Sequence, residues 1–271
     1  MPSVPRVRPY IQYARCAFQR RAAYRLANWT GVAVNFFFFL IHAQIFFAFF
    51  AGRAEVVGWS AYETVLYFAI SESLLMVIGV FPSQGGQELM ERIRNGDVSV
   101  DLARPVELYG RDLAERVGSA GYFLLARTTV LYLGCTWVYG LSAPLRIELW
   151  LWPVSLALAI GISGSLTYLA CATAFWTEHA RGPVGALVLI GWFLGGAVIP
   201  LDFYPDWLRL ICNLLPFRGT LYAPVALAAG KLAGGALAFS LAHQVVWFGL
   251  LATLSRAVET RGVRRLVVHG G

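Results

Sequence analysis

Long apolar stretches separated by short polar ones make up most of the chain from position 28 onward. The hydrocarbon core of a bilayer is about 30 Å thick, so roughly 20 helical residues are needed to cross it. No stretch alternates apolar and polar residues in the way that a membrane barrel requires. The pattern therefore predicts an all-α integral membrane protein, a single domain over 1–271, with six membrane-spanning helices at 28–51, 61–81, 117–141, 149–176, 183–201 and 235–255.

The composition supports this class of protein and orients it in the membrane. Only 14% of the 271 residues are charged, whereas soluble domains carry roughly 25% charged residues. Basic residues concentrate in cytoplasmic segments. With the N-terminus inside, 16 of the 22 basic residues fall in the inside segments 1–27, 82–116, 177–182 and 256–271. We therefore expect both termini in the cytoplasm, and this asymmetry explains the net charge of +7 without a nucleic-acid partner.

Two further segments have a helical pattern but do not read as spans. In 9–27, tyrosines and arginines recur at helical spacing, which suits an N-terminal helix in the cytoplasmic membrane interface. A plain basic anchor for the first span would have a similar composition, so both interpretations stay open. In 202–234, apolar runs of 10–15 residues are broken by proline and glycine, which predicts re-entrant or interfacial helices on the outer side.

Four polar side chains fall at membrane depth in this arrangement: Glu72, Arg127, His42 and His243. A lone charge at mid-bilayer costs roughly 2.5–3.5 kcal/mol on insertion scales, so Glu72 and Arg127 each need a partner or water. The two could form an ion pair that fixes helix packing, or they could line a translocation path. Each histidine is more typical of a packing hydrogen bond than of a ligand.

Common signatures of nucleotide-binding and metal-dependent enzymes do not occur. The sole lysine, Lys231, cannot belong to a P-loop, because Leu232 and Val225 stand where that motif needs a hydroxyl residue and a glycine. The sequence has no HExxH, GxSxG or CxxC motif, and its four cysteines are far apart. We therefore expect neither a metal site nor P-loop nucleotide binding in this chain.

The cytoplasmic segment after the second predicted span is unusually polar, with 11 of the chain's 37 charged residues in 91–116. Its charges are balanced in sign, which favours a protein partner over nucleic acid, since phosphate binding needs a basic excess. A solvated amphipathic linker would show the same balance. The segment is therefore either a linker or a docking surface for a soluble protein.

Local patterns divide this segment into helix, turn and helix. Over 86–95, Leu89 and Ile93 share one helical face, and Glu88 and Arg92 form an i, i+4 ion pair on another.

The helix should end at Asn95, because Gly96 is suited to the left-handed conformation that follows a helix. We expect a short extended or turn segment over 97–103. Pro105 can then occupy the first position of a second helix, 105–116, that leads into the third span.

This segment contains the motif Ile93-x-x-Gly96-Asp97, followed by Leu102-x-Arg104-Pro105. The motif resembles the hallmark of the type-2 permease family of ATP-binding-cassette (ABC) transporters, in its short six-span branch with a separate ATPase chain. The proline-rich outer segment before the last span, with Pro200, Pro205, Trp207, Leu215-Pro216-Phe217 and Pro224, also resembles that branch. The resemblance extends over nearly the whole chain.

The resemblance implies a bacterial inner-membrane exporter subunit with a coupling helix in the loop after the second span. That helix would seat in a groove of a cytoplasmic ABC ATPase dimer, which would bind ATP and magnesium in place of this chain. A second permease chain, identical or paralogous, would complete the transporter. The residues implied in ATPase coupling are Glu88, Glu91, Arg92, Ile93, Asn95, Gly96, Asp97, Leu102, Arg104 and Pro105.

The transported molecule is not specified by these motifs. Phenylalanines crowd the first span at 36–39, 46–47 and 49–50, which indicates either a path for a hydrophobic or amphipathic substrate or an ordinary lipid-facing surface. Two other classes of protein remain as alternatives. One is an intramembrane lipid-modifying enzyme that uses His42, His243 and Glu72, and the other is an assembly subunit that transports nothing.

Overall fold

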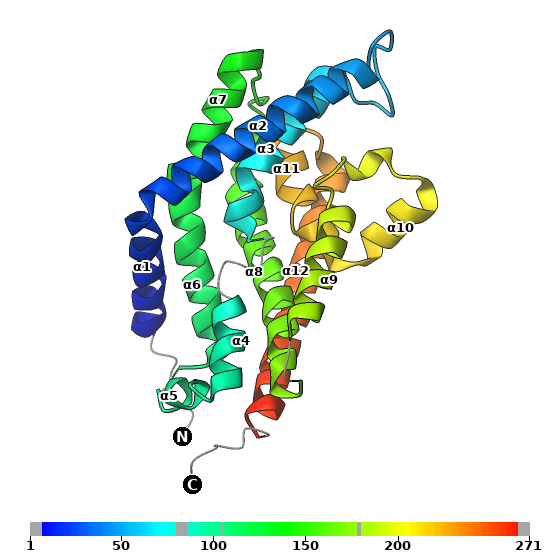
Figure 1. Ribbon diagram of the computed structural model, residues 1–271. Helices are drawn as coiled ribbons and strands as arrows, with labels where there is room; N and C mark the ends of the chain where they lie inside the picture. The colour runs from blue at the N-terminus through cyan, green and yellow to red at the C-terminus, as the bar shows by residue number, and fades with distance from the viewer. Residues whose placement is uncertain (1–6, 80–85, 105, 178–179, 265–271) are drawn as a thin grey trace.

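The computed structural model describes residues 7–79, 86–104, 106–177 and 180–264. Almost all regular structure in these ranges is helical (Figure 1). The helices are α1 (Val7–Ala23), α2 (Arg25–Phe49), α3 (Ala61–Ile78), α4 (Gly86–Asn95), α5 (Val98–Leu102), α6 (Leu108–Phe123), α7 (Thr129–Tyr139), α8 (Trp152–Ala172), α9 (Arg181–Leu194), α10 (Asp206–Leu214), α11 (Tyr222–Ala228) and α12 (Gly234–Val263).

Four helical segments are long and apolar enough to cross a membrane: Leu26–Phe49, Ala61–Ile78, Ile147–Phe175 and Gly234–Val263. They coincide with the first, second, fourth and sixth predicted spans, so the prediction of a multi-pass, all-α membrane protein is confirmed. The third predicted span corresponds to α6 and α7, joined by a π-helical turn, and the fifth to the 14-residue α9. The total of six spans stays a prediction.

The long axis of the bundle gives the molecule two ends (Figure 1). Helices α4 and α5, the start of α1 and the end of α12 lie at one end, which we call the α4–α5 end. The connection from α2 to α3 and the end of α7 lie at the opposite end. This arrangement brings segments from both extremes of the sequence next to the polar region between α3 and α6.

Helices α3 and α8 form the centre of the bundle, with 72% and 67% of their most apolar windows buried. Helix α3 starts in a capping box made by Ser60 and Glu63 and ends at Gly79, whose φ is +73°. Inside the bundle, the Tyr67 hydroxyl donates a 2.8 Å hydrogen bond to the carbonyl of Gly196. The central position of α3 therefore rests on both helix-end signals and tertiary contacts.

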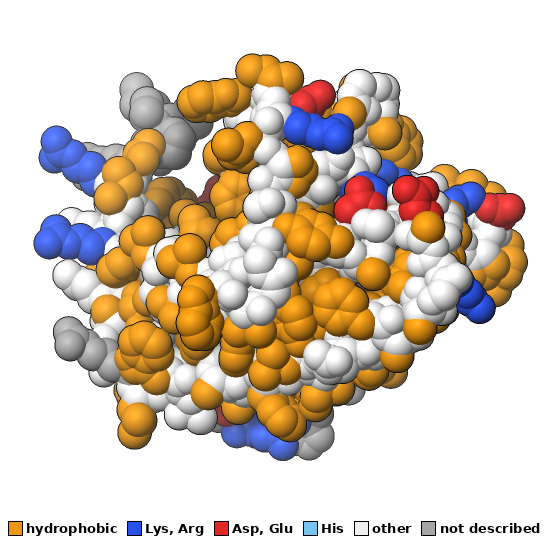
Figure 2. Space-filling view, turned by 90° about the horizontal axis from the view of Figure 1, so that it is seen from above, with side chains coloured by type: hydrophobic (Ala, Val, Ile, Leu, Met, Phe, Trp, Pro, Cys, Tyr) orange, Lys and Arg blue, Asp and Glu red, His pale blue; other side chains and the backbone are white. Residues whose placement is uncertain are grey.

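Helices α2 and α12 lie at the periphery, with only 22% of each apolar window buried. The phenylalanines of α2, together with Phe50, which follows it, are divided between two environments, with Phe39, Phe46 and Phe50 in the core and Phe37, Phe38, Phe47 and Phe49 exposed. Hydrophobic side chains also cover much of the face seen in Figure 2. A surface this apolar is suited to lipid or to another membrane chain.

Helix α1 packs along α6 (Figure 1). The two backbones approach so closely that a Cβ atom at Gly118 would lie 1.9 Å from the carbonyl oxygen of Ala14. The rings of Phe18 and Tyr122 extend the contact with an edge-to-face pair 5.7 Å apart. The N-terminal helix is therefore present as predicted, whereas its location in a membrane interface stays a prediction.

The fifth predicted span, 183–201, extends beyond the end of the helix that the structure shows there. Helix α9 ends at Leu194 because Gly195 and Gly196 follow, and Gly196 has a φ of +79°. The freed carbonyl of Gly195 accepts a 3.0 Å hydrogen bond from the backbone N–H of Tyr222. The following segment forms helices, as predicted: α10 is amphipathic, and α11 is buried throughout.

Candidate functional site

Helix α4 forms where the sequence predicts it and with the predicted faces. Ile93 is buried and Leu89 packs beside it, against a cluster that includes Tyr168 of α8. On another face, Arg92 Nη2 donates a 2.6 Å hydrogen bond to Glu88 Oε1. The helix ends at Asn95 and Gly96 has a φ of +81°, so the predicted helix stop is confirmed.

The prediction of an extended or turn segment over 97–103 was wrong. Residues Val98–Leu102 form the short helix α5. Ser99 Oγ donates a 2.8 Å hydrogen bond to the carbonyl of Gly96, and Val98 is buried. Asp101 faces inward, where two arginines bind its carboxylate. Local sequence alone does not favour so short a helix, and these tertiary contacts stabilise it.

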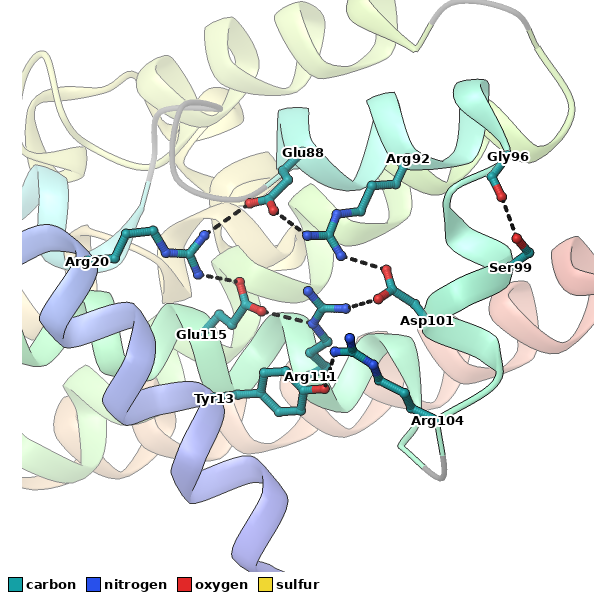
Figure 3. Close-up of polar contacts among 10 residues, drawn as sticks. All are labelled: Tyr13, Arg20, Glu88, Arg92, Gly96, Ser99, Asp101, Arg104, Arg111 and Glu115. Carbon is teal, nitrogen blue, oxygen red and sulfur yellow. Dashed lines mark hydrogen bonds and ion pairs between the residues drawn. The ribbon is translucent and has the colours of Figure 1, made fainter.

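Six side chains of alternating charge form a closed ring of ion pairs at this end of the molecule (Figure 3). They come from α1, α4, α5 and α6, and we call them the ion-pair ring. Its six N–O contacts are Arg20–Glu88 at 3.3 Å, Glu88–Arg92 at 2.6 Å, Arg92–Asp101 at 2.7 Å, Asp101–Arg111 at 2.5 Å, Arg111–Glu115 at 2.9 Å and Glu115–Arg20 at 3.3 Å.

The side chains of the ion-pair ring differ in how far they are exposed to solvent. Asp101 is its most buried member, with 7% of its side chain exposed, while Arg20 and Glu88 are close to half exposed. Burial disfavours the charged form of Asp101, but hydrogen bonds and charges from Arg92 and Arg111 outweigh it and hold the pKa of that carboxyl below its usual value. The strongest contacts therefore join α5 to α4 and α6, whereas the contacts with Arg20 are weaker.

Tyr13 of α1 reinforces the ring from one side. The Arg111 guanidinium lies 5.0 Å from the centre of the Tyr13 ring, and Arg104 donates a 3.3 Å hydrogen bond to the Tyr13 hydroxyl (Figure 3). These contacts add a cation–π pair to the charges that hold α1, α5 and α6 together.

Helix α6 begins three residues later than predicted, at Leu108. The Glu259 carboxylate on α12 accepts 2.9 Å hydrogen bonds from the backbone N–H groups of both Leu108 and Tyr109. A carboxylate in this position satisfies unpaired helix donors and is favoured by the helix dipole. Pro105 lies outside the described residues.

The side chains predicted to contact an ATPase fall into two groups. Glu88 and Arg92 belong to the ring and Ile93 to the core, so these three support the element from within. The remaining described residues lie on the exposed tip formed by α4, Gly96 and α5: Glu91, Asn95, Gly96, Asp97, Leu102 and Arg104. The described residues predicted to contact an ATPase thus lie in one region, but some of them face the ring and the core while the others face solvent.

Sequence reasoning missed the more exposed of the two exposed large hydrophobic side chains on this tip. Val100 is 61% exposed, and Leu102 beside it is 37% exposed. The motif included Leu102 but not Val100. It also missed Asp101, Arg111, Glu115, Arg20 and Glu259, whose roles depend on partners distant in the sequence. The available sequence signal for the tip was the pair of apolar residues Val100 and Leu102, two positions apart within the charged segment 91–116.

Arg127 and Glu72 do not form an ion pair in the part of the chain that the structure describes. Arg127 instead donates a 2.9 Å hydrogen bond from Nη2 to the carbonyl of Gly31. Gly31 is needed for this approach, since a Cβ there would lie 2.5 Å from Arg127 Nη1. Arg127 is buried within the π-helical turn Leu124–Thr128, so it joins α2 to this turn.

The two histidines have separate packing roles. His42 stacks on Phe68 with ring centres 5.2 Å apart, and His243 makes a 3.1 Å hydrogen bond with the carbonyl of Leu215. Among the described residues, no hydrogen bond joins either histidine to Glu72. The described residues also contain no group of three or more metal-ligating side chains.

Residues 32–270 match the family described as ABC-2 family transporter protein. The match covers most of the chain, so the chain belongs to this family of transporter membrane subunits. Membership implies partnership with an ABC ATPase. No curated protein matches the chain.

Proposed function

We propose that this chain is the membrane-spanning permease subunit of an ATP-driven exporter, and that its exposed α4–α5 tip docks on a separate cytoplasmic ATPase. The observation that carries the proposal is the ion-pair ring behind an exposed apolar tip. The ring fixes α4 and α5 to α1 and α6, while Val100 and Leu102 face outward. A rigid element with an exposed apolar contact is suited to transmit force from a partner protein.

The docking surface combines apolar and charged side chains. Val100 and Leu102 supply the apolar contact, and Glu91, Asp97 and Arg104 are also exposed on the tip. Interfaces of this kind derive most of their affinity from a few buried apolar or aromatic groups and their specificity from the polar rim. The ATPase surface should therefore offer a shallow apolar groove with charged edges.

Two routes carry movement of the tip into the membrane helices. The first passes through Asp101 and Arg111 into α6, which continues through the π-helical turn into α7. The second passes through the start of α6 to Glu259 on α12. Movement of α4 and α5 would therefore displace two helices of the bundle together, as alternating access requires.

The remaining parts of the proposal follow the family. The ATPase dimer binds ATP and magnesium, and a second permease chain, identical or paralogous, lies beside this one in the bacterial inner membrane. With six spans, both termini would lie on one side of the membrane, and the basic residues concentrated in 1–27, 82–116 and 256–271 support assigning this side, with the α4–α5 end, to the cytoplasm. The cargo is hydrophobic or amphipathic, consistent with the apolar helix surfaces at the periphery of the bundle.

Copurification tests this proposal. The tagged chain is expressed with its neighbouring genes, solubilised in detergent and compared with the double variant Val100→Glu/Leu102→Glu. A matched control, Leu145→Glu/Ile147→Glu, places the same charges on an exposed apolar pair with the same spacing. We expect an ABC ATPase to copurify with the wild type and the control but not with the tip variant.

Two outcomes contradict the proposal. If no ATPase copurifies with the wild type, the chain does not act as a permease of this kind, and an assembly role becomes the better hypothesis. If the tip variant retains the ATPase as well as the control does, the partner docks elsewhere on the chain.

A further inference from the structure

Arg218 is a buried cation in the turn Pro216–Gly219, between α10 and α11, and only 9% of the residue is exposed. It forms no ion pair among the residues that the structure describes. Arg116, which is similarly buried, has its counter-charge in Asp112 at 2.7 Å. A buried charge is costly unless an opposite charge and hydrogen bonds compensate it. The contacts around Arg218 therefore show what compensation is missing.

These contacts hold the guanidinium in place but leave one of its edges free. Nη1 donates a hydrogen bond to the side-chain oxygen of Asn213. The guanidinium carbon lies 5.0 Å from the centre of the Tyr222 ring and 5.2 Å from that of Phe239. Nε is buried without a hydrogen-bond partner, and Nη2 has none among the described residues either, but it is not enclosed. Nε and Nη2 form an edge that suits a carboxylate or phosphate, with two parallel hydrogen bonds.

The acidic side chains in this region are engaged elsewhere. The Tyr222 hydroxyl donates a 2.8 Å hydrogen bond to Asp202 Oδ2, and Asp206 pairs with Arg209. Neither carboxylate forms an ion pair with Arg218 in the described part of the chain. An external anion would therefore meet a free guanidinium edge, with no carboxylate already bound to it.

An exposed apolar stripe on α12 begins at the same place. Phe239, Val246 and Leu250 are 49%, 57% and 57% exposed, and their spacing of seven and then four residues places them on one face of the helix. From Phe239 to Leu250 the stripe is about 16 Å long. Phe239 lies in the second turn of α12, so Arg218 is near one end of this span and the stripe leads from it toward the middle.

We propose that Arg218 binds the phosphate of an anionic phospholipid, and that an acyl chain of this lipid lies along the α12 stripe. The phosphate oxygens accept hydrogen bonds from Nε and Nη2, and Phe239 lies where the headgroup meets the chain. A zwitterionic lipid fits less well, because no acidic side chain bound to Arg218 is there to take its ammonium group. The present chain supplies the whole site, and only its assignment to the outer leaflet rests on the proposed function.

The test uses the purified full-length chain in dodecyl maltoside, without any ATPase. The probe is phosphatidylglycerol with a photoreactive diazirine on one acyl chain, compared with diacylglycerol that carries the same chain and lacks the phosphate. Labelled peptides are identified by mass spectrometry. We expect phosphatidylglycerol to label residues 239–250 with a saturable dose dependence, and diacylglycerol to label them at least about tenfold less strongly, because it cannot form the charged hydrogen bonds.

Variants of two arginines test the assignment. Arg218→Gln removes the charge and should lower phosphatidylglycerol labelling of 239–250 at least about tenfold, with diacylglycerol labelling unchanged. Arg209→Gln is the matched control, because it removes the same charge from the neighbouring helix α10, where 40% of the Arg209 side chain is exposed. It should change labelling less than about twofold.

Equal labelling by the two probes would overturn the proposal, and so would an equal loss in the two glutamine variants. If a thermal melt shows that Arg218→Gln unfolds, Arg218→Lys and Arg209→Lys replace the pair. Lysine keeps the charge but cannot form the two parallel hydrogen bonds, so Arg218→Lys alone should weaken phosphatidylglycerol labelling. Equal labelling of the two lysine variants would contradict the proposal in the same way.

Competition identifies the occupant. Unlabelled phosphatidylglycerol should displace the probe. Equal displacement by phosphatidylcholine would show a site for any phospholipid, and displacement by inorganic phosphate alone would show a site for small anions. Either result contradicts the proposal. Failure of the ATPase to copurify would refute the transport function and leave this lipid-binding result intact.

Discussion

The Asp101 carboxylate on α5 and the Arg111 guanidinium on α6 are 2.5 Å apart. This contact joins a five-residue helix at the exposed tip to the helix that continues toward the interior of the bundle. Because Asp101 also binds Arg92 of α4, one carboxylate connects the three helices α4, α5 and α6. Loss of its charge should therefore affect the whole tip.

Asp101→Asn should loosen the α4–α5 element. The substitution keeps the shape of the side chain but removes the carboxylate between Arg92 and Arg111, so that each arginine keeps only its other ring partner, Glu88 or Glu115. Breaking a buried pair costs about 3–5 kcal/mol, and the exposure of the Arg92 side chain reduces this to about 2 kcal/mol. Hydrogen exchange over residues 86–104 should rise accordingly.

The matched control is Asp97→Asn, which removes a carboxylate from an exposed position two residues beyond Asn95. Surface substitutions of this kind change stability by less than about 0.5 kcal/mol. Equal exchange in the two variants would show that the ring does not stabilise the tip.

The same carboxylate predicts an acid transition. Because the pKa of Asp101 is lower in the folded protein than in an unfolded chain, its contribution is complete at pH values above the ordinary aspartate pKa of about 3.9. It is lost as the pH falls below that value, through the lowered pKa of the folded state. Near neutrality Asp101 stays charged, so it should cause no change in the protection factors of the amides in α4 and α5. In acid, where Asp101 is protonated, these protection factors should fall. Asp101→Asn should remove this part of the transition, and an unchanged transition would contradict the assignment.

Glu259→Gln should weaken the joint between α12 and α6. The amide can still accept one backbone N–H, but it loses the negative charge that the helix start favours. We expect a loss of about 1 kcal/mol, measured as a lower midpoint of thermal unfolding in detergent. Glu55→Gln, at an exposed position in the α2–α3 connection, is the control. Equal midpoints for the two variants would show that the Glu259 contact contributes no stability.

Gly118→Ala should separate α1 from α6. The new Cβ would lie 1.9 Å from a backbone oxygen of Ala14, and backbone cannot move aside as a side chain can. Overpacking of this kind costs about 1–3 kcal/mol, which a thermal melt would detect. Gly121→Ala tests the same helix with room to spare, since its Cβ would lie 3.8 Å from Phe18. Indistinguishable melts would argue against the close packing of these helices.

The sequence predicted what local spacing determines. Helix α4, its Glu88–Arg92 pair and its end at Gly96 depend on residues within four positions of one another, so periodicity and helix-end preferences were sufficient. The apolar stretches likewise predicted the four long helices, because length and hydropathy are properties of single segments.

The rest depends on contacts between distant segments. Arg20 and Glu115 are 95 positions apart, and Leu108 and Glu259 are 151 apart, so no local pattern could pair them. For the same reason the start of α6 was misplaced, because the Glu259 carboxylate that binds its first backbone N–H groups comes from a distant segment. The inward turn of Asp101, and with it helix α5, also required the tertiary structure.

Site-specific photocrosslinking tests the central claim most directly. The photoreactive residue p-benzoylphenylalanine replaces Val100 in one variant and Leu145, an exposed position in the connection after α7, in the other. Both are expressed with the neighbouring genes and irradiated in intact cells. If the tip docks on the ATPase, Val100 crosslinks to an ABC ATPase subunit and Leu145 does not. Absence of the ATPase from the Val100 product, or equal crosslinking from both positions, would contradict this account.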